Sequence, residues 1–233
     1  MNLQNIETLV LQLIKFDKYS DLSADATKIA DFAVLHQCVN LAREDFKINC
    51  SAPELLTIGA TIPTIVNMAG YSLAADFDIP VAFYYATSAS TNGNRLTKTT
   101  AEQLAASIAL STVGTPTTYC ILGTSGNLIQ VYLLPIPDVV GFLFPLYKPV
   151  LTALSLAADE DIILRKYPKI IINFATAYAA QMLKSDQVMY DKYYAIALSE
   201  CRKIDLRQIS GDTVPDLTVD TFLQTKRQDR LTI

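Results

Sequence analysis

The sequence predicts an α+β protein: a helical bundle, built from two N-terminal helices and a long C-terminal helix, with an inserted antiparallel β module and an extended C-terminal tail. Three observations predict this. Apolar residues recur at helical spacing near the start, runs rich in Ile, Val, Tyr and Thr follow between Gly and Pro residues, and a long helical pattern returns later. The expected parts are a helical hairpin at 1–50, the β module at 51–158, the C-terminal helices at 159–204 and the tail at 205–233.

Composition limits the classes of function. With 233 residues, 51% of them hydrophobic and only 18% charged, the chain can bury a large core and is expected to fold. A net charge of −4 with mixed acids and bases gives no broad basic face, which disfavours a protein that reads nucleic acid sequence. A ring through which DNA slides stays compatible, because such a channel needs only weak phosphate contacts.

Neither a membrane span nor a metal site is expected. The N-terminus has no cationic segment and no cleavage site of small residues, so it predicts a mature N-terminal helix. The longest apolar tract is interrupted by prolines, which break the helix that a span needs. The cysteines are far apart, lack any Cys-x-x-Cys pair and are expected to be free buried thiols. The interrupting prolines are Pro135, Pro137, Pro145 and Pro149, and the cysteines are Cys38, Cys50, Cys120 and Cys201.

Two antiparallel helices are expected before the β module. The first ends near Asp17, and Ser23 is the expected N-cap of the second. Both carry an apolar face at steps of three and four residues. The first face is Leu3, Ile6, Leu9, Val10, Leu13 and Ile14; the second is Ile29, Phe32, Ala33, Cys38, Val39, Ala42 and Phe46.

The β module contains two clear local signals. Thr100 and Gln103 have the spacing of a capping box at the start of a short helix. Two β-prone runs, at 117–122 and 128–134, are joined by the glycine-containing segment 123–127 and predict a hairpin. Pro135 ends the second run, and a further strand at 139–147 is expected to return alongside it.

The longest helical pattern begins at Tyr167, with Pro168 suited to the first turn and a break near Asp186. Its first half is apolar nearly all round, so it must be covered on more than one side. We therefore expect 167–186 to lie against the β module and against an adjacent copy of the chain. The predicted contact residues, in this helix and in the tail, are Ile170, Ile171, Phe174, Tyr178, Phe222, Leu223, Lys226, Arg227 and Arg230.

No catalytic or cofactor site is predicted. His36 is the sole histidine, and Cys38, two positions later on a helix, points to a different face. The acid pairs Asp76/Asp78 and Asp159/Asp161 lie in expected turns, where solvated carboxylates are ordinary. The glycine segment at 123–127 lacks the lysine and the following helix of a phosphate-binding loop.

The order of several short motifs resembles the head-to-tail adaptor, or connector, proteins of tailed bacteriophages. The motifs are GYSLAADF at 70–77 followed by PVAFYY, then GTPTTYCILG at 114–123, NLIQVYLLPIPD at 127–138 and the helix YPKIIINFATAYAAQMLKSDQVMYDKYY at 167–194. The chain departs from the family pattern in lacking tryptophan and in its last thirty or so residues.

The resemblance implies a structural virion protein that assembles in the host cytoplasm into a homo-oligomeric, commonly dodecameric, ring below the portal. It implies contacts with the portal and with downstream tail proteins, and DNA passing through the channel without sequence recognition. Two alternatives remain: another ring of the tail machinery, such as a tail terminator or tube protein, and a small-molecule-binding or hydrolytic enzyme that uses His36, Asp76 or Asp78.

Overall fold

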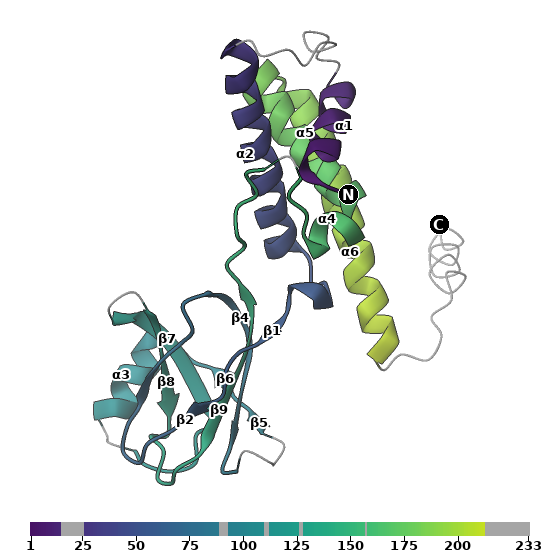
Figure 1. Cartoon of the computed structure of the whole chain (residues 1–233). Coiled ribbons are helices and arrows are strands. Elements are labelled where there is room, and N and C mark those ends of the chain that lie inside the picture. Colours follow the sequence, from purple (N-terminus) through teal and green to yellow (C-terminus); the bar gives the residue numbers. More distant parts are fainter. Residues whose placement is uncertain (15–25, 89–92, 110–111, 126–127, 157, 213–233) are drawn as a thin grey trace, which may run out of the picture. The chain divides into compact units, whose positions relative to one another are not determined.

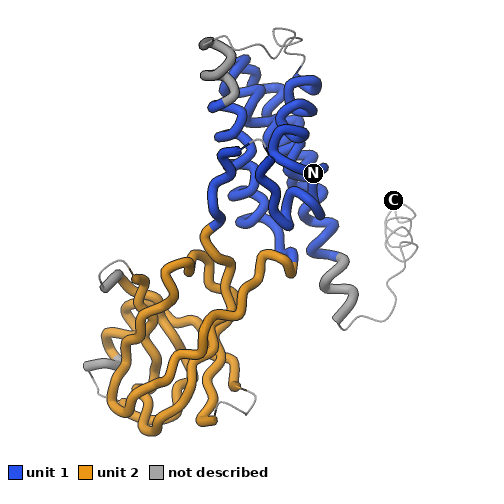
Figure 2. The backbone as a smooth tube through the Cα atoms, viewed as in Figure 1, with its two compact units in different colours: residues 1–52, 151–233 blue, residues 53–150 orange. Residues whose placement is uncertain are grey.

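The chain forms two compact units, one made from both ends of the sequence and one made from its middle. In the computed structural model, residues 1–52 and 151–233 form the helical unit, and residues 53–150 form the β unit (Figure 2). The structure describes residues 1–14, 26–88, 93–109, 112–125, 128–156 and 158–212. Helices and sheets are segregated in the sequence, so the predicted α+β class is confirmed.

The helical unit is organised around one central helix. The helices of this unit are α1 (Leu3–Leu13), α2 (Ala26–Asn49), α4 (Ile162–Lys166), α5 (Pro168–Lys184) and α6 (Gln187–Asp212). Helix α5 packs against α1, α2, α4 and α6, and Figure 1 shows it among the other helices. Pro168 occupies the first turn of α5 as predicted, where its missing N–H costs nothing.

The break predicted near Asp186 is confirmed. Ser185 adopts a left-handed conformation with φ of 53° and ends α5. The N–H of Asp186 returns to the carbonyl of Ala180, at 3.1 Å, and the Asp186 carboxylate accepts the N–H of Met189 at 2.9 Å. Asp186 therefore helps to close one helix and caps the next.

The apolar faces of the first two helices are confirmed in part. Leu3, Ile6 and Val10 are buried, whereas Leu9 and Leu13 are exposed, and α1 ends at Leu13 instead of near Asp17. On α2 the face from Cys38 to Phe46 is buried and Ala33 is exposed. The predicted cap Ser23 lies outside the described residues, as do the side chains of Ile29 and Phe32.

Helix α6 is longer than the sequence predicted. It continues to Asp212 and passes through Gly211, so the helix end expected near Asp205 was wrong. One glycine costs a helix only about 1 kcal/mol, and the last turn tolerates it best. The rest of the predicted tail, residues 213–233, lies outside the described residues.

The β unit consists of two sheets that enclose one core. The first sheet has the order β1 (Thr57–Ile58), β9 (Phe142–Pro149), β4 (Phe77–Ala86), β5 (Asn94–Arg95), and β2 (Ile62–Pro63) also pairs with β9. The second has the order β3 (Gly70–Ser72), β8 (Leu128–Leu134), β7 (Thr118–Ser125), β6 (Thr97–Lys98). All pairs are antiparallel except β6 with β7, so the module is mixed, not wholly antiparallel. The core residues are Tyr71, Leu73, Phe77, Phe83, Tyr85, Leu96, Tyr119, Val131, Leu133, Leu143 and Tyr147.

The predicted hairpin is confirmed in β7 and β8, which pair from Thr118 opposite Leu134 to Ser125 opposite Leu128. The strand continues past Gly123, which has φ of +59° and lies in a bulge between Ile121 and Thr124. The glycine therefore bends the strand and does not end it.

The partner predicted for the next strand was wrong. Strand β9 pairs with β4, in the sheet opposite β8. Residues 135–141 separate β8 from β9, which is longer than a tight hairpin turn and lets the chain cross between the sheets.

Two short helical segments complete the β unit, η2 (Pro53–Leu55) and α3 (Ala101–Ala109). The capping box predicted for α3 is confirmed. Gln103 N donates to Thr100 Oγ1 at 3.3 Å, and Thr100 N donates to Gln103 Oε1 at 3.4 Å.

Candidate assembly surfaces

The three α5 residues predicted to contact a neighbouring copy are core residues of a single chain. Ile171 and Phe174 are 0% exposed and Ile170 is 5% exposed. The ring of Phe174 meets that of Tyr194 on α6 at 5.2 Å between centroids. Helices of the same unit supply the cover that the apolar circumference of α5 demands, so these side chains are not available for a subunit contact.

Tyr178, the fourth predicted contact residue on α5, is half-buried and ties α5 to α2. Its hydroxyl donates a hydrogen bond to the carboxylate of Asp45. Its ring lies edge-on to Tyr190, at 5.9 Å between centroids and 70° between planes. Burial and the bond to Asp45 raise the pKa of Tyr178, so the phenol stays protonated and keeps donating.

The remaining predicted contact residues are Phe222, Leu223, Lys226, Arg227 and Arg230, which lie outside the described residues. Their role stays a prediction.

The acid pair Asp159/Asp161 holds the chain in place around α4. Asp159 Oδ2 accepts the N–H groups of Ser155 and Leu156 at 2.7 and 2.8 Å, and these bonds lower the pKa of Asp159. Asp161 caps α4 through Leu164 N at 2.8 Å and accepts Arg43 Nε at 2.8 Å. Both carboxylates are committed to structural contacts.

Asp76 also makes a structural contact. It accepts a hydrogen bond from the hydroxyl of Tyr147 at 2.8 Å. Burial, and then the bond to Asp76, raise the pKa of Tyr147 to about 12. Asp78 lies in β4, so the two acids predicted to share a turn belong to different elements.

His36 has a partner that the sequence did not predict. His36 Nε2 lies 3.0 Å from Glu7 Oε1, a buried oxygen with which no donor is aligned for a hydrogen bond. Burial raises the pKa of Glu7 to about 7 and lowers that of His36. Glu7 lies between Leu3 and Val10 on the buried stripe of α1, so helical spacing could have placed this acid inside.

Cys38 does not pair with His36, as the helical spacing predicted. Its Sγ lies 3.7 Å from Met182 Sδ on α5, and burial raises its pKa to about 12. A thiol with so high a pKa is a poor nucleophile. Within the described ranges, no three His, Cys, Asp or Glu side chains are grouped so that they could hold a metal ion.

Two adjoining loops of the β unit, 64–68 and 137–141, carry a group of exposed large apolar side chains, and we call these loops the apolar tip. Ile65 and Val140 are each 59% exposed. The other large apolar side chains exposed there are Val66, Met68 and Val139. Clustered exposed apolar side chains of this kind mark interaction surfaces.

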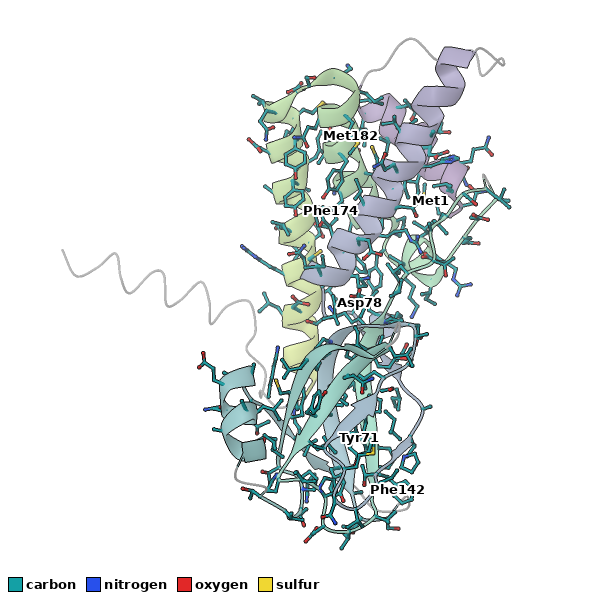
Figure 3. All side chains as sticks on the ribbon, turned by 90° about the vertical axis from the view of Figure 1, so that its left-hand side faces the viewer. Met1, Tyr71, Asp78, Phe142, Phe174 and Met182 are labelled. Carbon is teal, nitrogen blue, oxygen red and sulfur yellow. The ribbon has the colours of Figure 1, made fainter. Side chains whose placement is uncertain are left out.

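Hydrogen bonds fix the apolar tip in one conformation. Thr64 N donates to Gly141 O at 2.8 Å, and Gly141 N donates to the buried Thr64 Oγ1 at 2.9 Å. The hydroxyl of Tyr71 donates to the carbonyl of Met68 at 2.6 Å. Figure 3 labels Tyr71 and also Phe142, the residue that follows Gly141. The tip is a preformed surface, so binding need not order it first.

The helical unit has a hollow of about 490 Å³, which we call the apolar groove. Leu13, Val188 and Met189 give it apolar walls, and Val188 is 81% exposed. The full lining is Leu13, Ile14, Lys184, Asp186, Val188, Met189, Lys192 and Tyr193.

A second hollow, of about 560 Å³, lies in the β unit and is basic. Arg95 and Lys98 line it beside Tyr119, with no carboxylate in the lining. It offers positive charge but no acid and base pair for catalysis.

No protein-family model and no curated protein sequence matches the chain.

In the part of the chain that the structure describes, no helix is both long and apolar enough to cross a membrane.

Proposed function

We propose that the protein is a structural component of a phage virion, forming a ring that connects the capsid portal to the tail and lets DNA pass through its channel. The observation that carries the proposal is the apolar tip. It exposes a preformed group of large apolar side chains, Ile65 and Val140 foremost, and such a surface is costly to leave in water unless a protein partner covers it.

Two further features support an adaptor in particular. The order of the motifs from Gly70 to Tyr194 resembles the adaptor family. Helices α2, α5 and α6 form long packed helices, whereas a tail terminator or tube protein is expected to contain more sheet and no long helical hairpin.

An enzyme is less well supported. Asp76 is hydrogen-bonded to Tyr147, and His36 lies against a buried carboxylate. Loss of an activity in His36→Ala, with the fold intact, would favour an enzyme over this proposal.

Mixing the purified protein with the portal protein of the same phage tests the proposal. Native mass spectrometry and negative-stain imaging are expected to show a ring seated on the portal. A chain that stays monomeric at every concentration, and that leaves the portal bare, would contradict the function.

A further inference from the structure

The apolar tip and the apolar groove are exposed apolar surfaces of opposite form. The apolar tip of the β unit is formed by turns, with Ile65 and Val140 facing solvent. The apolar groove of the helical unit is hollow, and its volume of about 490 Å³ falls within the range of about 300–1,000 Å³ that holds a compact ligand group. A few aliphatic side chains are of suitable size to fill it.

The charges of the two surfaces are complementary. Asp138 is the one charged residue of the tip loops, and it is exposed. Of the two lysines lining the groove, Lys184 donates to the carbonyl of Ile14. Lys192 is exposed, and its Nζ lies 5.4 Å from the ring centroid of Tyr193.

Lys192 is the cation best placed to meet an incoming acid. Within the described residues, no carboxylate forms an ion pair with it. The one acid in the lining, Asp186, is already the N-cap of α6. An acid that approaches the groove therefore finds Lys192 without an ion-pair partner among the described residues.

Charge disfavours a contact between two tips or between two grooves. Two tips in contact would bring two Asp138 carboxylates together, and two grooves in contact would bring two Lys192 ammonium groups together; like charges facing each other are unfavourable. A contact between a tip and a groove joins unlike surfaces. Such heterologous contacts close into a ring when the rotation from one copy to the next completes a circle.

We propose that the apolar tip of one copy inserts into the apolar groove of the next copy, with Asp138 facing Lys192. The inference rests on the proposed ring function and names the surfaces that build the ring. Ile65, Val139 and Val140 supply the apolar contact, and the charge pair fixes its orientation.

Chemical cross-linking between copies tests this contact in the full chain. Val140→Cys and Val188→Cys are made in separate chains, one of them isotopically labelled, mixed under assembly conditions and treated with a short bis-maleimide. The native cysteines are buried, which keeps their background labelling low. We expect the yield of cross-linked product between labelled and unlabelled chains to be at least about tenfold higher than for a control pair, Val140→Cys with Leu206→Cys. Leu206 is a suitable control because it is exposed but lies outside the groove.

Leu13→Cys serves as a second reporter in the groove, in case Val188→Cys folds poorly. Asp138→Lys is expected to lower the cross-link yield about tenfold, and Lys192→Asp in the partner copy is expected to restore that yield. Cross-links no stronger than the control, or found only between two tips, would overturn the inference. If rings form on the portal without the tip-to-groove cross-link, the inference fails and the proposed function stands; if no ring forms under any condition, the proposed function fails.

Discussion

Helix α5 of the helical unit and the apolar tip of the β unit differ in how far their apolar side chains are covered. In the helical unit the most apolar segment, α5, is enclosed by its own helices, and Phe174 is 0% exposed. In the β unit a well-filled core coexists with an exposed apolar tip, where Ile65 is 59% exposed. Hydrophobicity along the sequence therefore marks the core, whereas the candidate contact surface is formed by two short loops.

Side-chain size explains how one unit can enclose its apolar helix. Ala175, Ala177, Ala179 and Ala180 let neighbouring helices approach α5 closely, and all are 0% exposed. The tip has no such cover. Its backbone is held where Thr64 Oγ1 accepts the N–H of Gly141 and the Tyr71 hydroxyl donates to the carbonyl of Met68, while its large apolar side chains stay exposed.

Two variants of the helical unit compare the stability contribution of a buried side chain with that of an exposed one. Phe174→Ala should lower the free energy of unfolding by about 3–5 kcal/mol, because it opens a cavity in a buried cluster. Val188→Ala, at an exposed position on α6, should change it by no more than about 0.5 kcal/mol. Urea unfolding followed by circular dichroism measures both. Equal effects would contradict the burial of α5 within one chain.

The next effect depends on pH and concerns Glu7. Burial raises its pKa from 4.5 to about 7, so the fold favours the neutral acid. The contribution of neutral Glu7 to the free energy of unfolding is therefore present in full below pH 4.5. It is lost as the pH rises towards 7, by about 3 kcal/mol in total. Glu7→Gln should remove this loss.

The measurement is the difference in unfolding free energy between wild type and Glu7→Gln at pH 5 and at pH 8; His36 is present in both chains. Glu102→Gln, which changes an exposed acid on α3, is the matched control and should leave the pH dependence unaltered. A Glu7→Gln chain that loses stability with pH as the wild type does would show that Glu7 is not the buried acid responsible.

A smaller effect concerns the base of the apolar tip. Thr64→Val should cost about 1–3 kcal/mol, because the N–H of Gly141 then has no acceptor. Thr64→Ser keeps the hydroxyl and should cost less. Thermal unfolding of both variants gives the comparison. If valine is tolerated as well as serine, this hydrogen bond does not hold the tip.

Local signals predicted much of the fold. The Thr100 and Gln103 capping box, Pro168 in the first turn of α5 and the break at Asp186 each depend on a few adjacent residues. The β7–β8 hairpin belongs to the same class, because its turn lies between its own strands.

The parts that the sequence did not predict depend on contacts between distant segments. Strand β9 pairs with β4 across more than fifty residues of sequence, and no local pattern specifies that choice. The cover of α5 depends on where α1, α2 and α6 pack, so its apolar circumference was misread as a surface for another copy. The apolar tip joins loops far apart in the sequence, and neither loop shows a helical or strand period.

Substitutions that change the apolar tip and leave the core intact test whether the tip is the assembly surface. The double variant Ile65→Ser, Val140→Ser should keep its unfolding free energy within about 0.5 kcal/mol per site, because both side chains are exposed. Its control is Ile58→Ser, Val81→Ser, which changes exposed apolar residues of β1 and β4. Mass photometry of each chain mixed with the portal protein should show rings for wild type and control and none for the tip variant. A folded tip variant that forms rings as wild type does would contradict the claim that the apolar tip is the surface of assembly.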